Sequence, residues 1–569
     1  MTNSSPLSPA SPRRVVPAWI FALGGAFLLT LAILIPFYCY GSASGHDFEF
    51  HAASWLDAAY QWQEGTLFPR WTAWTNHGFG EPRFIFYPPL SWLLGGALTR
   101  ILPGPWVPVV FILLIQSLAG LFAFFLLRRL TCQKAAVLGA LCYVINPDAL
   151  LMIYIRSDFA EQLACAIFPL LLLAALALAE LLEDSAQNLS AIALFALPFA
   201  AVWLSNAPAG VIASYSMALL FAWAALTQRS WRIAFRSAAG LALGLGLAGV
   251  YLIPAAYEQR WVNINQALSS GLLPVQNFLF TRIDDPEHTW FNWIASTCAL
   301  FILFLFAVAA LGSRRFACAS DVPPRHRKLW TTLLIVGTAA SLLMLRPTLP
   351  LWTYLPKLRF VQFPWRWMSI LTLVTACFLA TIFQKRRGWL WFVLLLMLSV
   401  PFSFFLVSNG WWDSDEMQTQ AAAISSGNGF DGTDEYDPVG DDHMDLPPKA
   451  PLTIVLPENK AASGLQGATV QVLTWKTEKK AIRVDTPKEA RLALRLLNYP
   501  AWQVAVNGKV IQPERMDDVN QMVIPLVPGH SEIRVRLIRT PDRTTGIILS
   551  LVSILPTAIF LLWSRTRRR

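Results

Sequence analysis

Residues 105–127 read PWVPVVFILLIQSLAGLFAFFLL, and the basic pair Arg128-Arg129 follows directly. This uncharged stretch exceeds the roughly 20 apolar residues that a helix needs to cross the hydrocarbon layer of a bilayer. Arginines at one end of such a stretch are typical of its cytoplasmic side. The stretch predicts a membrane-spanning helix, and similar runs recur along the chain.

The composition agrees with a protein built from many such helices. Apolar residues make up 55% of the 569 residues and charged residues only 14%, and the mean hydropathy is +0.47. Soluble domains have about 25% charged residues, so this chain has too few charges to cover several soluble cores. These values exclude a water-soluble enzyme, a disordered scaffold and a disulfide-rich secreted module, and they indicate a polytopic membrane protein.

Apolar runs give twelve predicted spans. The runs are 17–40, 105–127, 135–153, 162–182, 190–205, 208–227, 237–257, 290–312, 329–345, 367–384, 388–407 and 545–563. If Arg13-Arg14 lie in the cytoplasm, the basic clusters between the spans and the C-terminus fall on the cytoplasmic side as well. The net charge of +10 is therefore spread over membrane-flanking clusters, and no basic stripe indicates binding to nucleic acid.

The charge pattern also divides the chain into parts. We expect a disordered cytoplasmic tail at 1–16 and a transmembrane domain at 17–407 with an outer loop at 41–104. An extracytoplasmic loop and domain follow at 408–543, and a last helix with a basic cytoplasmic tail occupies 544–569. Within the outer loop, the Pro-Pro-Leu segment at 88–101 predicts a helix lying in the outer interface, because a further span would invert the topology downstream.

The outer segment 408–543 has the pattern of a small β domain. Apolar and polar residues alternate around Ile533 and around Val504, and Asn507-Gly508 is a two-residue hairpin signal. The segment has no cysteine, so we expect an antiparallel sandwich that is stable without disulfides. The acidic, glycine-rich stretch 427–445 before it fits a solvated loop over the outer mouth better than a calcium site, because its spacing differs from that of an EF-hand.

We expect the twelve spans to contain no Asp, Glu, Lys or Arg, which counts against an ion-coupled transporter. The candidate chemistry lies instead directly after the first span, in Gly45-His46-Asp47-Phe48-Glu49-Phe50-His51. If the segment is extended, Asp47, Glu49 and His51 share one side and suit a divalent ion. If it is helical, Asp47 and His51 share a face instead. The alternative is a helix cap formed by Asp47, with solvated histidines.

Further candidate residues follow in three outer segments. Their aromatic side chains suit stacking on sugars, and their arginines suit an anionic lipid head group, although each taken singly also fits an anchor at the membrane interface. The segments contain Arg70, Trp71, Arg83 and Tyr87; Arg156, Asp158 and Glu161; and Arg359, Gln362 and Arg366.

These motifs resemble two known groups of membrane proteins. An acidic pair in the first outer loop, followed by a Pro-Pro-Leu helix, resembles the GT-C glycosyltransferases. More closely, residues 46–51, 69–71, 86–90, 156–161, 362–366 and 434–436 resemble a bacterial membrane protein family named "6-pyruvoyl-tetrahydropterin synthase-related". Nothing in these residues indicates pterin chemistry. The strand around Asn498-Tyr499-Pro500-Ala501-Trp502 also resembles the outer domain of YfhO-type membrane glycosyltransferases.

The resemblance implies a GT-C-like fold, a polytopic all-α membrane domain of about twelve helices with a small extracytoplasmic β-sandwich before the last one. It implies a location in the bacterial inner membrane and transfer of a sugar, with inversion, from a polyprenyl-phosphate donor to a glycan, lipid or protein acceptor. Asp47 matches the loop-one acid that acts as base or orients the acceptor, and Glu49 takes the second acidic position. Asp-x-Glu stands where Asp-x-Asp is commoner, so a divalent cation, Mg²⁺ or Mn²⁺, is a candidate cofactor rather than a fixed one.

On this interpretation Asp47 and Glu49 are catalytic and bind the metal together with His51. His46, Arg70, Trp71, Tyr87, Arg156, Asp158, Glu161, Arg359, Gln362 and Arg366 bind substrate. The alternative is a non-catalytic membrane protein that binds or helps to export a lipid-linked glycan. The two hypotheses differ in one structural expectation, since only the enzyme needs Asp47, Glu49, Arg156 and Arg366 in one outer cavity.

Overall fold

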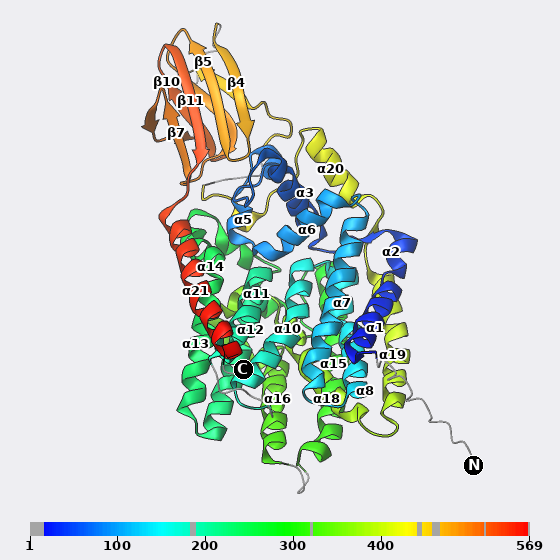
Figure 1. Ribbon diagram of the computed structural model, residues 1–569. Coiled ribbons are helices and arrows are strands. Elements are labelled where there is room, and N and C mark those ends of the chain that lie inside the picture. The colour runs from blue at the N-terminus through cyan, green and yellow to red at the C-terminus, as the bar shows by residue number, and fades with distance from the viewer. Residues whose placement is uncertain are drawn as a thin grey trace, which may run out of the picture.

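Apolar helices form the body of the protein, and a β domain is attached at one end of them (Figure 1). The computed structural model describes residues 16–182, 189–318, 323–440, 446–457, 467–516 and 519–566. Within these ranges nine helices are long and apolar enough to cross a membrane. The protein is therefore a multi-pass membrane protein, as its composition predicts.

Each of the twelve predicted spans coincides with a helix. The nine clear candidates are α1–α2 (Ala18–Ile33 and Ile35–Tyr40), α7 (Trp106–Arg128), α8–α9–η1 (Gln133–Val144, Pro147–Leu151 and Met152–Arg156), α10 (Phe159–Leu178), α12 (Ala207–Gln228), α15 (Pro286–Cys318), η7–α18 (Pro364–Trp367 and Met368–Phe383), α19 (Gly388–Asn409) and α21 (Pro541–Thr566). The tenth, α11 (Ser190–Ser205), is shorter. It ends where the sequence predicts a break, because the Asn206 side chain caps α12 by accepting a hydrogen bond from the amide of Ala209.

The two remaining predicted spans, 237–257 and 329–345, belong to helix pairs with a sharp bend. Helix α13 (Trp231–Leu247) turns by 74° into α14 (Gly249–Glu258) and η2 (Gln259–Trp261). Helix α16 (Pro324–Leu343) turns by 94° into η5 (Arg346–Thr348) and α17 (Leu349–Tyr354). After both bends the chain continues at the end of the bundle that holds the β domain. Residues there form part of the wall of a cavity.

The expectation of spans without ionisable residues is wrong at Asp148. This residue lies in α9, inside the predicted span 135–153, and its side chain is buried in the bundle. Glu180, which the predicted span 162–182 includes, falls beyond the end of α10 and contacts Arg232 and Arg236. Arg156, Glu161 and Arg366 are also buried, near the ends of candidate spans. The composition argument against an ion-coupled transporter is therefore weaker than the sequence indicates.

The outer loop 41–104 folds into a helical cap on the bundle. Its helices are α3 (Phe48–Glu64), α4 (Thr75–Gly78), α5 (Arg83–Phe86) and α6 (Pro89–Ile101). Helix α6 starts at the predicted Pro-Pro-Leu motif and packs on α3, where Gly95 leaves room for the indole of Trp55. It is not among the candidate spans of the described residues, which agrees with the prediction that this segment does not cross the membrane.

The predicted β-sandwich is present between residues 453 and 537. One sheet has the order β3-β6-β10-β9 and the other β4-β5-β11-β7-β8, and all pairs are antiparallel. The strands are β3 (Thr453–Pro457), β4 (Thr469–Lys476), β5 (Lys479–Thr486), β6 (Ala490–Leu497), β7 (Trp502–Val506), β8 (Lys509–Ile511), β9 (Glu514–Arg515), β10 (Gln521–Leu526) and β11 (Gly529–Leu537). Asn507 and Gly508 both have positive φ, as the predicted hairpin turn requires.

The sandwich is attached to the membrane domain by aromatic and ionic contacts. The Trp71 ring packs against Tyr499 and Trp502, with centroids 5.6 and 5.3 Å apart. Arg543, at the start of α21, forms a buried ion pair with Glu258 of α14 at 2.7 Å. A two-residue ladder between β1 (Ser42–Ala43) and β2 (Trp412–Asp413) and the short helix α20 (Glu416–Ser425) complete this end.

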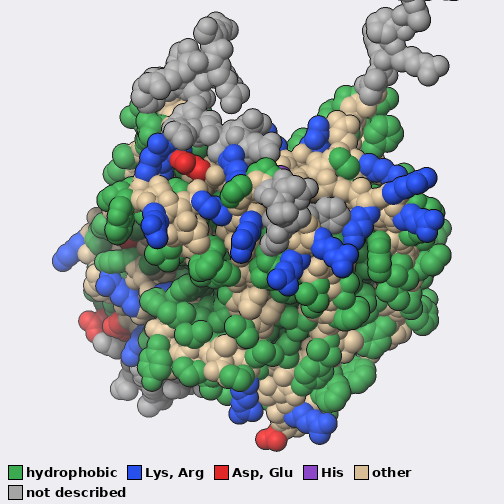
Figure 2. Space-filling model, turned by 90° about the horizontal axis from the view of Figure 1, so that it is seen from below, with side chains coloured by type: hydrophobic (Ala, Val, Ile, Leu, Met, Phe, Trp, Pro, Cys, Tyr) green, Lys and Arg blue, Asp and Glu red, His purple; other side chains and the backbone are tan. Residues whose placement is uncertain are grey.

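The opposite end of the bundle is rich in basic side chains. Figure 2, seen from that end, shows Lys and Arg side chains over much of the surface and few acidic ones. The predicted clusters at Arg128-Arg129 and at Lys385-Arg386-Arg387 follow helices that end there. The predicted tails lie almost wholly outside the described residues, which begin at Val16 and end at Thr566.

Candidate functional site

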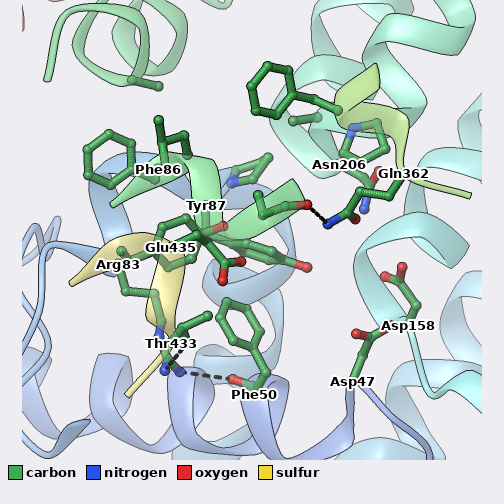
Figure 3. Close-up of a pocket in the computed structure, with 18 of the residues that line it drawn as sticks. Asp47, Phe50, Arg83, Phe86, Tyr87, Asp158, Asn206, Gln362, Thr433 and Glu435 are labelled. Atoms are coloured by element: carbon green, nitrogen blue, oxygen red, sulfur yellow. Dashed lines mark hydrogen bonds between the residues drawn. The ribbon is translucent and has the colours of Figure 1, made fainter. Parts of the chain in front are cut away.

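A cavity of about 870 Å³ lies at the end of the bundle that holds the sandwich. The cap helices, the α11–α12 break, the bent helix α14 and the loops around 357–366 and 429–436 form its walls. Figure 3 shows Asp47 and Asp158 on one side, Gln362 and Asn206 near them, and Tyr87, Arg83 and Glu435 on the other side. The predicted solvated loop at 427–445 does cover this mouth as far as Tyr436. The other half of the candidate calcium stretch, 441–445, lies outside the described residues.

The local backbone fixes the position of Asp47. The amide of Asp47 donates to the carbonyl of Arg156 over 3.0 Å, and the amide of Gly45 donates to the hydroxyl of Ser157. A Cβ atom on Gly45 would lie 2.2 Å from the carbonyl oxygen of Ile155, so the approach requires glycine. These hydrogen bonds join two segments that lie more than 100 residues apart in the sequence. They place Asp47 beside Arg156.

Arg156 is the centre of a buried cluster of charges. Its Nη2 atom lies 3.2 Å from Oδ2 of Asp47 and 2.7 Å from Oδ2 of Asp158, and its Nη1 atom lies 2.6 Å from Oε2 of Glu161. Arg366 contacts two of these three acids, since it lies 3.0 Å from Glu161 and 3.6 Å from Asp158. The cluster thus pairs three carboxylates with two guanidinium groups, and the side chain of Asp47 alone among the three carboxylates is substantially exposed, at 38%.

The environment sets the protonation of the groups around Asp47. Burial opposes the ionisation of Asp158, yet Arg156, His51 and Arg366 together hold its pKa well below the usual range. Partial burial lowers the pKa of His46, although Asp47 opposes this effect. Burial and the nearby carboxylates raise the pKa of Tyr87 well above 10, so its phenol keeps its proton. The cavity therefore offers a carboxylate at Asp158, a neutral imidazole and a phenol.

The predicted metal triad is not brought together. Helix α3 begins at Phe48, so the extended arrangement of Asp47, Glu49 and His51 is wrong. Glu49 faces the cavity with Asp47, but His51 is buried behind it, with Nε2 3.7 Å from Asp158 and Nδ1 3.5 Å from Ser91. Among the described residues no group of three or more His, Cys, Asp or Glu side chains has the arrangement of a metal site. Asp47 does stand at the N-cap position, without a capping hydrogen bond from its side chain.

Most of the other predicted site residues line the cavity or lie directly behind it. His46, Asp47, Glu49, Tyr87, Asp158, Gln362 and Arg366 are in its wall, while Arg156 and Glu161 contact wall residues. Arg70 and Trp71 are outside it, because they pack at the junction with the sandwich, where Glu478 accepts the amide hydrogen bond of Arg70. Arg359 lies in a neighbouring recess.

Glu435 lines the cavity but is not among the predicted site residues. It lies on the loop over the mouth, and burial raises its pKa to about 7. The loop is tied to the cap because Arg83 donates to the hydroxyl of Thr433 and Glu81 accepts from the amide of Thr433, both over 2.9 Å. The sequence pointed to this residue only indirectly, through the acidic stretch 427–445 and through the motif Asp434-Glu435-Tyr436 of the family resemblance.

Comparisons with known proteins give one family. Residues 84–409, more than half of the chain, match a family described as "6-pyruvoyl-tetrahydropterin synthase related domain; membrane protein". No curated protein and no solved structure matches the chain. The family match includes Arg156, Asp158, Glu161 and Arg366, but it begins after Asp47 and ends before the sandwich.

Proposed function

The chain belongs to the 6-pyruvoyl-tetrahydropterin synthase related family of membrane proteins, and from the chemistry of its cavity we propose that it is a glycosyltransferase. The enzyme moves a sugar from a polyprenyl-phosphate donor to a glycan, lipid or protein acceptor. The observation that supports this best is the placement of Asp47, a carboxylate that is oriented by Arg156 and partly exposed to a large cavity next to the membrane domain.

We place the cavity and the sandwich outside the cytoplasm, in the inner membrane of a bacterium. The basic side chains at the other end of the bundle support this orientation, because cytoplasmic loops are enriched in Lys and Arg. An outward-facing cavity next to lipid suits a donor whose sugar is carried on an isoprenoid chain. Both termini are then cytoplasmic.

In the proposed reaction Asp47 acts as general base. The hydroxyl oxygen of the acceptor attacks the anomeric carbon, its proton passes to the Asp47 carboxylate, and the bond from the anomeric carbon to the phosphate oxygen breaks. The electron pair leaves with polyprenyl phosphate, and in-line attack inverts the anomeric centre. Arg156 orients the Asp47 carboxylate, while the Tyr87 phenol and the Gln362 amide in the wall are donors for sugar hydroxyls.

No step of the proposed mechanism is assigned to a divalent ion. His51 is directed to Asp158, and Oδ2 of Asp47 is already in contact with Arg156, so the predicted triad does not fit Mg²⁺ or Mn²⁺. Arg156 and Arg366 are each paired with two or more carboxylates, so they hold the acids in place rather than receive the leaving phosphate.

The test uses purified full-length protein in nanodiscs with polyprenyl-phosphate hexoses that carry a radiolabelled sugar. An envelope extract supplies acceptors, and release of polyprenyl phosphate is measured with and without EDTA. We expect transfer by the wild type and a loss of about 100-fold or more for Asp47→Asn. Asp485→Asn, at an exposed site on the sandwich, is the matched control and should keep full activity.

Donor binding is measured in parallel with transfer. Equal transfer by Asp47→Asn and wild type would refute the assignment of Asp47. Tight donor binding without transfer to any acceptor would instead support the alternative, a non-catalytic protein that binds or helps to export a lipid-linked glycan.

A further inference from the structure

A second recess, of about 620 Å³, adjoins the cavity at the same end of the bundle. It lies between the chain that follows the bent helix α14, the segment 357–360 and Val439. It shares four wall residues with the cavity, namely Gln259, Ile264, Lys357 and Phe360. The two spaces are therefore neighbours across one thin wall, and Lys357 faces both.

The recess is basic. The described residues of its wall include Arg260, Lys357 and Arg359, and none of these described residues is acidic. Among the described acidic side chains none forms an ion pair with these three, whereas Arg83, Arg156, Arg366 and Arg543 are each paired with buried carboxylates. The three cations therefore remain available for an anion, unlike the arginines of the Asp47 cluster.

Aromatic rings hold the three cations in place. The guanidinium of Arg260 lies 3.8 Å from the ring centroid of Tyr257, and Lys357 and Arg359 lie 5.0 and 5.1 Å from that of Phe360. Lys357 also donates to Oε1 of Gln259 over 3.2 Å. Its backbone has a φ of 61°, in the left-handed region that residues other than glycine rarely adopt. Stacking of this kind orders the side chains while leaving most of their N–H donors unused.

The surroundings of the recess suit the surface of a membrane. Tyr354 is 83% exposed and Leu351 46% exposed on α17, just before Lys357, and Tyr257 is 44% exposed beneath Arg260. Exposed aromatic and apolar side chains beside cations are typical of the bilayer interface. Basic clusters are expected at the other end of the bundle, so a cluster at this end needs a reason of its own.

We propose that this recess binds the phosphate group of a membrane lipid beside the mouth of the cavity. The recess supplies cationic donors to the phosphate, and the exposed apolar rim lets the lipid chains stay in the bilayer. This inference concerns binding alone and does not depend on sugar transfer. On the proposed function, it would hold the phosphate of the lipid donor that the Asp47 cluster has no spare cation to bind.

The experiment measures lipid binding to the purified full-length protein in a neutral detergent by native mass spectrometry. The probes are undecaprenyl phosphate, phosphatidylglycerol, phosphatidylcholine and inorganic phosphate. We expect both anionic lipids to bind the wild type, and the triple variant Arg260→Gln/Lys357→Gln/Arg359→Gln to lose about 100-fold in affinity. A preference for undecaprenyl phosphate assigns the site to an isoprenoid lipid, and equal affinity assigns it to anionic phospholipids in general.

The matched control removes the same charge at the same end. Arg100, Arg282 and Arg346 are exposed and lie outside the recess, so Arg100→Gln/Arg282→Gln/Arg346→Gln should bind like the wild type. A charge-preserving variant, Arg260→Lys/Lys357→Arg/Arg359→Lys, should retain binding within a few-fold. The proposal is overturned if the triple Gln variant binds as well as the wild type, if the control loses as much, or if inorganic phosphate binds as tightly as the lipids.

Discussion

Arg156 contacts Asp47 through a single nitrogen, Nη2, over 3.2 Å, while the same nitrogen lies 2.7 Å from Asp158. Asp158 is buried and fully engaged, and it also caps α10 by accepting from the amide of Glu161. Asp47 has the longer contact and the exposed edge. One guanidinium group thus holds the buried Asp158 and orients the exposed Asp47, which is why the two carboxylates have different roles in the proposed reaction.

Replacing Arg156 should destabilise the whole protein. In Arg156→Gln the buried Asp158 and Glu161 keep only their contacts with Arg366 and His51, and breaking a buried pair by removing one partner costs about 3–5 kcal/mol. The apparent melting temperature in detergent should fall markedly. Arg232→Gln is the control, because Arg232 is half exposed and lies 3.4 Å from Glu180, and its melting temperature should stay near that of the wild type. Equal melting of both variants would contradict the buried cluster.

Glu435 should make stability depend on pH. Burial raises its pKa to about 7, above the value of about 4.5 in the unfolded chain, so the folded state binds more protons between these values. Its contribution to the free energy of unfolding is fully present below pH 4.5 and is lost as the pH rises through 7. Glu435→Gln should therefore lose less stability than the wild type between pH 5 and pH 8 in thermal unfolding. Glu489→Gln, the same substitution at an exposed site just before β6, should follow the wild type.

Lys480 should have an effect of the opposite sign in a different pH window. Burial between Trp475 and Trp502 lowers the pKa of its amine to about 7, from about 10.5 in the unfolded chain. The stabilising contribution is present above pH 10.5 and is lost as the pH falls to 7. Lys480→Met should remove this dependence, so that its melting temperature gains most over the wild type near pH 6–7. The exposed neighbour gives the control Lys479→Met, and a gain of the same size there would count against the prediction.

The helices were predictable because each span is a local property of the sequence. The same holds for the hairpin at Asn507-Gly508, where the turn needs two residues that tolerate positive φ. Trp71 shows the limit of local evidence. Its stretch fits both sugar stacking and an anchor at the membrane interface. Only the sandwich, more than 400 residues further along the chain, shows that Trp71 packs at the junction with that domain instead.

The site was predictable only in part for the same reason. Arg156, Asp158 and Glu161 are close in the sequence, so their cluster could be anticipated, and Arg366 joins them through the tertiary fold alone. The triad with His51 failed because the spacing fits a strand and a helix equally well until the start of α3 is known. Arg260 reaches the recess because the chain bends between α13 and α14, and the hydropathy of the sequence does not predict that bend.

The loop over the cavity should open when Gly432 is replaced by alanine. An added Cβ atom would overlap the Oδ1 atom of Asn76, and Asn76 has little freedom to move, because its Nδ2 atom donates to the buried Asp437 over 2.6 Å. Overpacking of this kind costs about 1–3 kcal/mol, which the loop can avoid by leaving the cap.

Hydrogen exchange in peptides covering 427–437 should therefore quicken in Gly432→Ala, while the sandwich strands keep their protection. Because Glu435 moves out with the loop, the pH dependence of stability should also flatten toward that of Glu435→Gln. Gly24→Ala is the control, since no atom lies within 4 Å of the added Cβ there. Unchanged exchange in 427–437 together with an unchanged pH profile would mean that the loop is not held by the contact at Asn76.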